Sequence, residues 1–108
     1  MTTTGPKFGN ALKTFVDGVQ AIVRNNIETN FPSLPVPVIT IEKGKRYIRI
    51  VRNERGQGRS VHCFIDTTNG DVLKAAGWKA PAKHARGNIF NPDNGLGSVG
   101  PYGGNYLR

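Results

Sequence analysis

The chain has 108 residues, which fits one domain and leaves no room for a second packed core. Its 15 Lys and Arg residues outnumber its 7 Asp and Glu residues, and the net charge of +8 favours nucleic acid, an anionic membrane or an acidic protein surface as a partner, with a solubility device as the alternative. One cysteine, Cys63, excludes an internal disulfide, and no apolar run is long enough to span a membrane, so we expect an unexported protein in a reducing compartment.

Residues 7–31 carry the clearest helical pattern. Apolar residues recur there at spacings of three and four, which places them in one stripe of an amphipathic helix. The stripe consists of Phe8, Leu12, Phe15, Val16, Val19, Ile22, Val23 and Ile27. Pro6 suits the first turn, and Pro32 ends the pattern. Because the opposite face mixes both signs of charge, we expect the stripe to cover the domain's own core; a partner-binding or membrane-surface helix is the alternative.

The next part of the chain alternates apolar and polar residues, which predicts β-strands. Four such segments follow a proline-rich connector, at residues 38–42, 46–52, 59–66 and 71–75. Asn69-Gly70, between the last two, is a strong hairpin signal because both central residues of a tight turn need positive φ. The pattern predicts a four-stranded antiparallel meander, with one face under the helix and the other largely free.

The last part of the chain combines a basic segment with a glycine-rich ending. Residues 80–86 are expected to form a short basic helix, since Pro81 suits a first turn and Gly87-Asn88 stops it. Residues 91–108 are rich in Gly, Pro and Asn, which predicts an extended tail without regular structure.

Together these patterns predict a single α+β domain over residues 1–108. A long N-terminal helix packs on a four-stranded antiparallel meander, followed by a short basic helix and an irregular Gly-rich C-terminal tail. Residues 1–6 are expected to be a flexible N-terminus.

Residues 59–88 contain a block with a distinctive Trp-Lys-Ala-Pro-Ala-Lys run at 78–83. The block reads Arg59-Ser60-Val61-His62-Cys63-Phe64-Ile65-Asp66, then Asn69-Gly70-Asp71-Val72, then Trp78-Lys79-Ala80-Pro81-Ala82-Lys83-His84-Ala85-Arg86-Gly87-Asn88. It resembles a block shared by small, mostly uncharacterised proteins of tailed bacteriophages. The resemblance implies a phage origin and localisation in the host cytoplasm, and it supplies no catalytic or binding residues.

Cations and aromatic residues are interleaved through the strands and the segment after them. Cations that follow phosphates, beside rings on which bases stack, hold single-stranded nucleic acid without reading its sequence. On the second strand, Arg49 shares a face with Tyr47, opposite Ile48 and Ile50. The predicted nucleic-acid-binding residues are Lys43, Lys45, Arg46, Tyr47, Arg49, Arg52, Arg59, Phe64, Lys74, Trp78, Lys79, Lys83 and Arg86. The alternatives are a solvated basic face and, for Trp78, a position in the core.

Patterns typical of enzymes are weak in this chain. His62 and Cys63 are adjacent on a predicted strand, so their side chains should point to opposite faces and cannot pair as base and nucleophile. Two histidines and one cysteine give no metal-ligand spacing. Asp66 and Asp71 flank a hairpin, where turn residues are favoured over the paired acids of a nuclease. We therefore expect no catalytic residues, no metal and no cofactor.

The expected function is non-catalytic nucleic-acid binding, with single-stranded DNA as the ligand. The alternative is a protein-interaction or virion accessory protein, which forms a homo-oligomer or meets a host protein through the open sheet face or sheet edge. Tyr102 and Tyr106 in the tail fit either a partner contact or a clamp on the fold.

Overall fold

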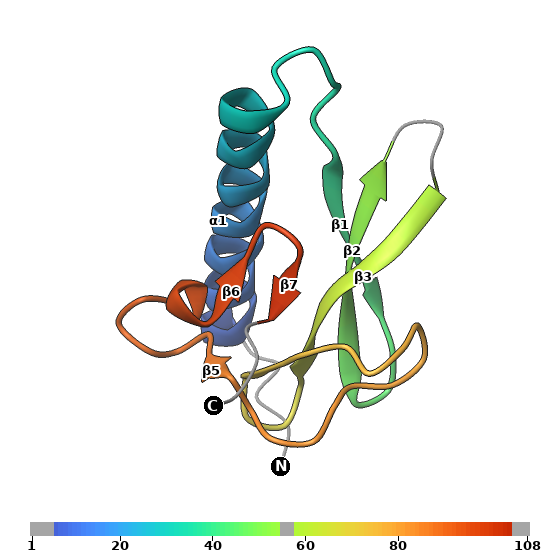
Figure 1. Ribbon diagram of the computed structural model, residues 1–108. Helices are drawn as coiled ribbons and strands as arrows, with labels where there is room; N and C mark the ends of the chain where they lie inside the picture. Colours follow the sequence, from blue (N-terminus) through green and yellow to red (C-terminus); the bar gives the residue numbers. More distant parts are fainter. Residues whose placement is uncertain (1–5, 55–57, 105–108) are drawn as a thin grey trace.

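A long helix and a five-stranded antiparallel sheet make up most of the computed structural model, which describes residues 6–54 and 58–104 (Figure 1). The predicted α+β class is confirmed. Most of the predicted flexible N-terminus, residues 1–5, and Tyr106 lie outside the described residues.

Helix α1 spans Pro6–Asn30, close to the predicted bounds. Its buried side chains are spaced by three or four residues: Phe8, Leu12, Phe15, Val19, Val23 and Ile27. All of them except Ile27 belong to one hydrophobic core with strand residues that include Ile48, Ile50 and Ile65. The helix ends before Pro32, with the Phe31 N–H donating to the Ile27 carbonyl at 2.8 Å. The prediction that the helix covers the domain's own core is confirmed.

The predicted meander forms the first four strands of the sheet. They are β1 (Val38–Lys43), β2 (Tyr47–Glu54), β3 (Gly58–Asp66) and β4 (Asp71–Leu73), in that order and all antiparallel. A fifth strand, β5 (Gly87–Asn88), pairs with β4 and was not predicted, because two residues carry no alternation.

The turn between β3 and β4 differs from the tight turn that Asn69-Gly70 suggested. Within this turn, which the structure describes in full, Gly70 has positive φ (82°) and Asn69 does not. The Gly70 N–H donates to the Asp66 carbonyl at 2.8 Å, so the hairpin closes through a longer loop. Gly70 is also required by space, since a Cβ there would lie 2.8 Å from the Phe90 ring.

The segment between β4 and β5, residues 74–86, is a loop, and the short basic helix predicted at 80–86 is wrong. Ala75 and Pro81 form an antiparallel bridge, and the Ala82 N–H donates to the Lys74 carbonyl at 2.7 Å. The loop therefore folds back on itself with Trp78 near its tip, and we call it the Trp78 loop. A seven-residue helix without a buried face is marginal in isolation, so these tertiary contacts outweigh the local helix signal.

The glycine-rich tail folds onto the molecule, which corrects the prediction of an extended irregular tail. It contains the 3₁₀ turn η1 (Leu96–Ser98) and a small hairpin of β6 (Val99–Gly100) and β7 (Gly103–Gly104). Figure 1 shows this hairpin beside α1, and Val99 belongs to the core. Leu96 packs against Gly18 of α1, where a Cβ would lie 2.4 Å from the Leu96 side chain.

The sheet has an inner face under α1 and an outer face turned away from it. On β2, Ile48 and Ile50 belong to the core on the inner face, and Tyr47 and Arg49 lie on the outer face as predicted. The outer face is not largely free, because the Trp78 loop crosses it. Figure 1 shows the loop, in yellow and orange, running alongside the sheet from β4. The structure thus creates one covered region of the outer face that contains both strand and loop residues.

Candidate functional site

Trp78 and two arginines form the centre of the covered outer face. The guanidinium carbons of Arg49 and Arg59 lie 4.5 Å and 5.0 Å from the centre of the Trp78 ring, in cation–π contact. Arg49 Nε also donates to the Trp78 carbonyl at 2.8 Å. Arg49 comes from β2 and Arg59 from β3, so the loop tip is held by two neighbouring strands.

One carboxylate holds both arginines in place. Glu42, on β1, accepts from Arg49 Nη1 at 2.8 Å through Oε1 and pairs with Arg59 Nη2 through Oε2. The hydrogen bond from Arg49, together with Arg59, holds the pKa of Glu42 below its ordinary value, so this acid stays ionised at neutral pH.

The shared carboxylate holds two cations against the tryptophan. Glu42 bonds Arg49 through one oxygen and Arg59 through the other, and both guanidiniums contact the Trp78 ring. Trp78 keeps 38% of its surface exposed, which corrects the alternative of a core position. The ring therefore contacts two arginines and keeps exposed surface for a ligand.

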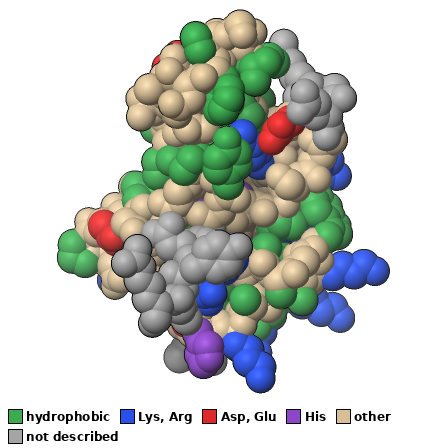
Figure 2. All heavy atoms as spheres, in the orientation of Figure 1, with side chains coloured by type: hydrophobic (Ala, Val, Ile, Leu, Met, Phe, Trp, Pro, Cys, Tyr) green, Lys and Arg blue, Asp and Glu red, His purple; other side chains and the backbone are tan. Residues whose placement is uncertain are grey.

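A hollow of about 380 Å³ lies beside Trp78, between the β1–β2 turn and the Trp78 loop. We call it the lysine hollow, because Lys43, Lys45 and Lys79 line it and all three are exposed. Within residues 6–54 and 58–104, none of these ammonium groups forms an ion pair. In Figure 2, Lys and Arg side chains project at the lower right of the molecule, the region where Figure 1 shows the β1–β2 turn.

Arg46, Tyr47 and Phe64 form the far wall of the lysine hollow. Arg46 lies over the Tyr47 ring at 5.2 Å and bonds Asp66 at 3.3 Å. Burial opposes ionisation of Asp66, but hydrogen bonds from Thr68 and Arg46 outweigh it and lower the pKa of this acid. Phe64 is only 2% exposed and contacts Tyr47 edge to face, so it supports the site and cannot stack on a ligand as predicted.

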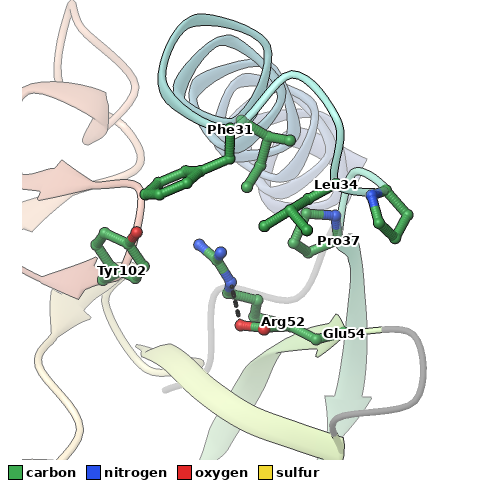
Figure 3. A pocket seen from close by; sticks show the side chains of 8 residues that line it. Phe31, Leu34, Pro37, Arg52, Glu54 and Tyr102 are labelled. Carbon is green, nitrogen blue, oxygen red and sulfur yellow. Dashed lines mark hydrogen bonds and ion pairs between the residues drawn. The ribbon is translucent and has the colours of Figure 1, made fainter.

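Arg52 was predicted to join this set and does not. It lies on the inner side of the sheet, paired with Ile39 across β1 and 4% exposed. Figure 3 shows it in another hollow, of about 190 Å³, with its bond to Glu54 drawn as a dashed line. Arg52 also donates to the Pro101 carbonyl at 2.6 Å and contacts the Tyr102 ring. This arginine anchors the tail hairpin to the sheet.

The remaining predicted cations lie on the limbs of the Trp78 loop. Lys74 is partly buried where the loop leaves β4, and Lys83 is exposed on the returning limb. Arg86 donates to the His84 carbonyl near the start of β5. Nine of the predicted residues line the lysine hollow or take part in the contact between Trp78 and the two arginines: Lys43, Lys45, Arg46, Tyr47, Arg49, Arg59, Phe64, Trp78 and Lys79. Sequence reasoning missed Glu42, which only the β1–β2 register identifies as the partner of Arg49.

The side chains of His62 and Cys63 contact each other, although they were expected to point to opposite faces of the strand. A register shift between Ile50 and Val51 leaves His62 without a partner on β2, and this bulge turns it toward Cys63, with Nδ1 and Sγ 3.3 Å apart. His62 Nε2 donates to the Gly100 carbonyl at 2.7 Å. Burial lowers the pKa of His62 and raises the pKa of the Cys63 thiol. The His62 imidazole connects β3 to the tail, and the thiolate that a nucleophile requires is disfavoured at Cys63.

The aspartates Asp66 and Asp71 act as hydrogen-bond acceptors near the β3–β4 turn. Asp66 accepts hydrogen bonds from the Thr68 N–H and hydroxyl in the turn after β3. Asp71 accepts from the side-chain amide of Asn88, its partner across the β4–β5 pair, so both acids stabilise local structure. Among the described residues, no group of three or more His, Cys, Asp or Glu side chains could hold a metal ion. In the same part of the chain, no helix is long and apolar enough to cross a membrane.

Comparisons with known proteins give a family without an assigned activity. No curated protein and no solved structure matches the chain. Residues 10–107 match a family that is described as a family of unknown function (DUF7717). The match includes α1 from residue 10 onward, all the described strands and the Trp78 loop, and the chain therefore belongs to the DUF7717 family of unknown function.

Proposed function

We propose that this protein binds nucleic acid without catalysis, and that single-stranded DNA is its ligand. The observation that carries the proposal is an exposed tryptophan ring on two arginines, next to three lysines that form no ion pair within residues 6–54 and 58–104. The ring offers a stacking surface worth about 1–3 kcal/mol per base, and the lysines offer charge for phosphates. The resemblance to tailed-phage proteins favours a role during infection, in the host cytoplasm.

The arginines around Trp78 contribute less charge than their number suggests. Arg46, Arg49 and Arg59 each pair with an acid, and Glu42 offsets one of the two charges beneath the ring. The proposal therefore assigns phosphate contacts mainly to Lys43, Lys45 and Lys79, and base stacking to Trp78 with Tyr47 beside it. Lys74, Lys83 and Arg86 would extend the basic surface along the Trp78 loop.

The test is a binding titration with labelled oligonucleotides of about 15 nucleotides at about 50 mM salt. Single-stranded DNA, duplex DNA and single-stranded RNA of one sequence are compared by fluorescence anisotropy. We expect the single strand to bind more tightly than the duplex, because only an unpaired base can stack on Trp78. Equal or tighter duplex binding would contradict the assignment of a single-stranded ligand, and no binding of any probe would overturn the proposal.

A protein-interaction role is the second candidate, and the hollow in Figure 3 favours it. Phe31, Leu34 and Tyr102 line this hollow and are 43%, 50% and 65% exposed. The neighbouring edge of β1 is partly covered, since Gln20 bonds the Ile39 N–H and the Pro37 carbonyl. Under this alternative, a second copy of the chain or a host protein contacts the apolar hollow. Light scattering checks it: a stable oligomer together with no oligonucleotide binding would favour this function.

A further inference from the structure

A further hollow, of about 320 Å³, lies between β3 and the Trp78 loop. Its walls are Arg59, Ser60 and Val61 of β3 and Ala75, Ala76, Gly77 and Trp78 of the loop. We call it the Ser60 hollow. Unlike the lysine hollow it contains one charged side chain, and the rest of its lining is small, apolar or aromatic apart from the Ser60 hydroxyl. An aromatic ring beside small side chains and a hydroxyl is a lining on which an unstacked nucleobase can pack and form a hydrogen bond.

The lysine hollow and the Ser60 hollow are lined by neighbouring residues at the tip of the Trp78 loop. Trp78 is a wall of the Ser60 hollow, and the next residue, Lys79, is a wall of the lysine hollow. Beneath the ring, Arg49 lines the lysine hollow, Arg59 lines the Ser60 hollow, and Glu42 bonds both. Because consecutive Cα atoms are about 3.8 Å apart, a short ligand can contact both Trp78 and Lys79.

We propose that the two hollows bind different parts of the same nucleotide strand: the lysine hollow binds phosphates, and the Ser60 hollow binds one unstacked base against Trp78. This inference rests on the proposed nucleic-acid binding and adds a division of labour to it. The three lysines line one hollow and Trp78 lines the other, which matches the separation of phosphate and base within a nucleotide. A base that remains in a duplex is paired and stacked, so it cannot enter the Ser60 hollow.

Gly77 provides a way to fill the Ser60 hollow. A Cβ at this position meets no atom within 4 Å, and Gly77 is not among the positive-φ glycines. Gly77→Leu therefore adds a bulky side chain at the wall of the Ser60 hollow without removing any charge or the tryptophan, and Gly77→Ala is the matched control that adds only a methyl group. Ala21→Leu, on the exposed side of α1, controls for the added apolar surface. Circular dichroism and thermal unfolding establish that each variant is folded.

The experiment compares a normal single-stranded oligonucleotide with an abasic strand that has the same number of phosphates. For the wild type, we expect the normal strand to bind about 5- to 150-fold more tightly than the abasic strand, the range for one stacked base. Gly77→Leu should remove this difference by weakening the normal strand alone, and Gly77→Ala and Ala21→Leu should preserve it.

The outcomes separate this inference from the proposed function. If folded Gly77→Leu binds the normal strand as the wild type does, or weakens both strands equally, the Ser60 hollow does not bind a base. If the wild type binds normal and abasic strands equally, phosphate binding stands and the base site is refuted. If neither strand binds at about 50 mM salt, the proposed function itself fails.

Discussion

The lysine hollow leads to a quantitative prediction about salt. If Lys43, Lys45 and Lys79 each neutralise one phosphate, the affinity for a single strand should fall with a log-log slope of about −0.7 per lysine, or about −2.1 for the three. A fourfold rise in salt, from about 50 to about 200 mM, should then weaken binding about 18-fold. The paired arginines add little to this slope. A guanidinium that is already paired with a carboxylate neutralises little phosphate charge, so few counterions leave the strand.

The variant to measure is Lys79→Gln, with Lys13→Gln as its matched control. Both changes remove one exposed positive charge, but Lys13 lies on α1 and bonds Asp17 at 2.7 Å, away from the outer face. Anisotropy titrations at four or so salt concentrations should give a slope that is shallower by about 0.7 for Lys79→Gln and unchanged for Lys13→Gln. Equal slopes for the two variants would refute the assignment, because binding would then respond to net charge and not to the hollow.

Three further predictions concern the acid in the site, the buried histidine and the helix glycines. Glu42→Gln frees both arginines beneath the tryptophan, so it should tighten oligonucleotide binding and steepen the salt slope; weaker binding would show that the carboxylate is needed to position them. Burial lowers the pKa of His62 from 6.5, so the unfolded chain binds a proton more readily than the folded one. Urea titrations should therefore show the free energy of unfolding decreasing as pH falls below 6.5, by up to about 1.4 kcal/mol per pH unit, and His62→Gln should lack this decrease. Gly9→Ala should stabilise α1 by up to about 1 kcal/mol, whereas Gly18→Ala should gain less because it must displace Leu96; equal gains would contradict the packing described.

Much of the fold could be predicted because its signals are local. The helix follows from apolar spacing in residues 7–31, and the first four strands follow from alternation. The Trp78 loop could not be predicted, since Pro81 gives the same signal at the first turn of a helix as in the bridge with Ala75. The tail was misjudged because glycine was taken as a sign of irregular chain. At Gly103 it instead permits close packing, since a Cβ there would lie 2.6 Å from the His62 carbonyl.

The candidate site was predicted in part. Alternation on β2 placed Tyr47 and Arg49 together, and the same rule places Arg52 on the inner side, where the structure has it. The role of Glu42 depends on strand register, which a single sequence does not disclose. The contact between His62 and Cys63 depends on a bulge. A bulge adds one unpaired residue to a strand, so side chains beyond it no longer alternate between the two faces as the sequence pattern predicts.

Trp78 fluorescence tests the central claim most directly. Trp78 is the one tryptophan of the chain, so its emission reports on the outer face without interference from other sites. Addition of a single-stranded oligonucleotide at about 50 mM salt should change this emission in a saturable way, and added salt should restore it. Binding that is detected by anisotropy and leaves Trp78 emission unchanged would contradict the account, because the strand would then be held somewhere else.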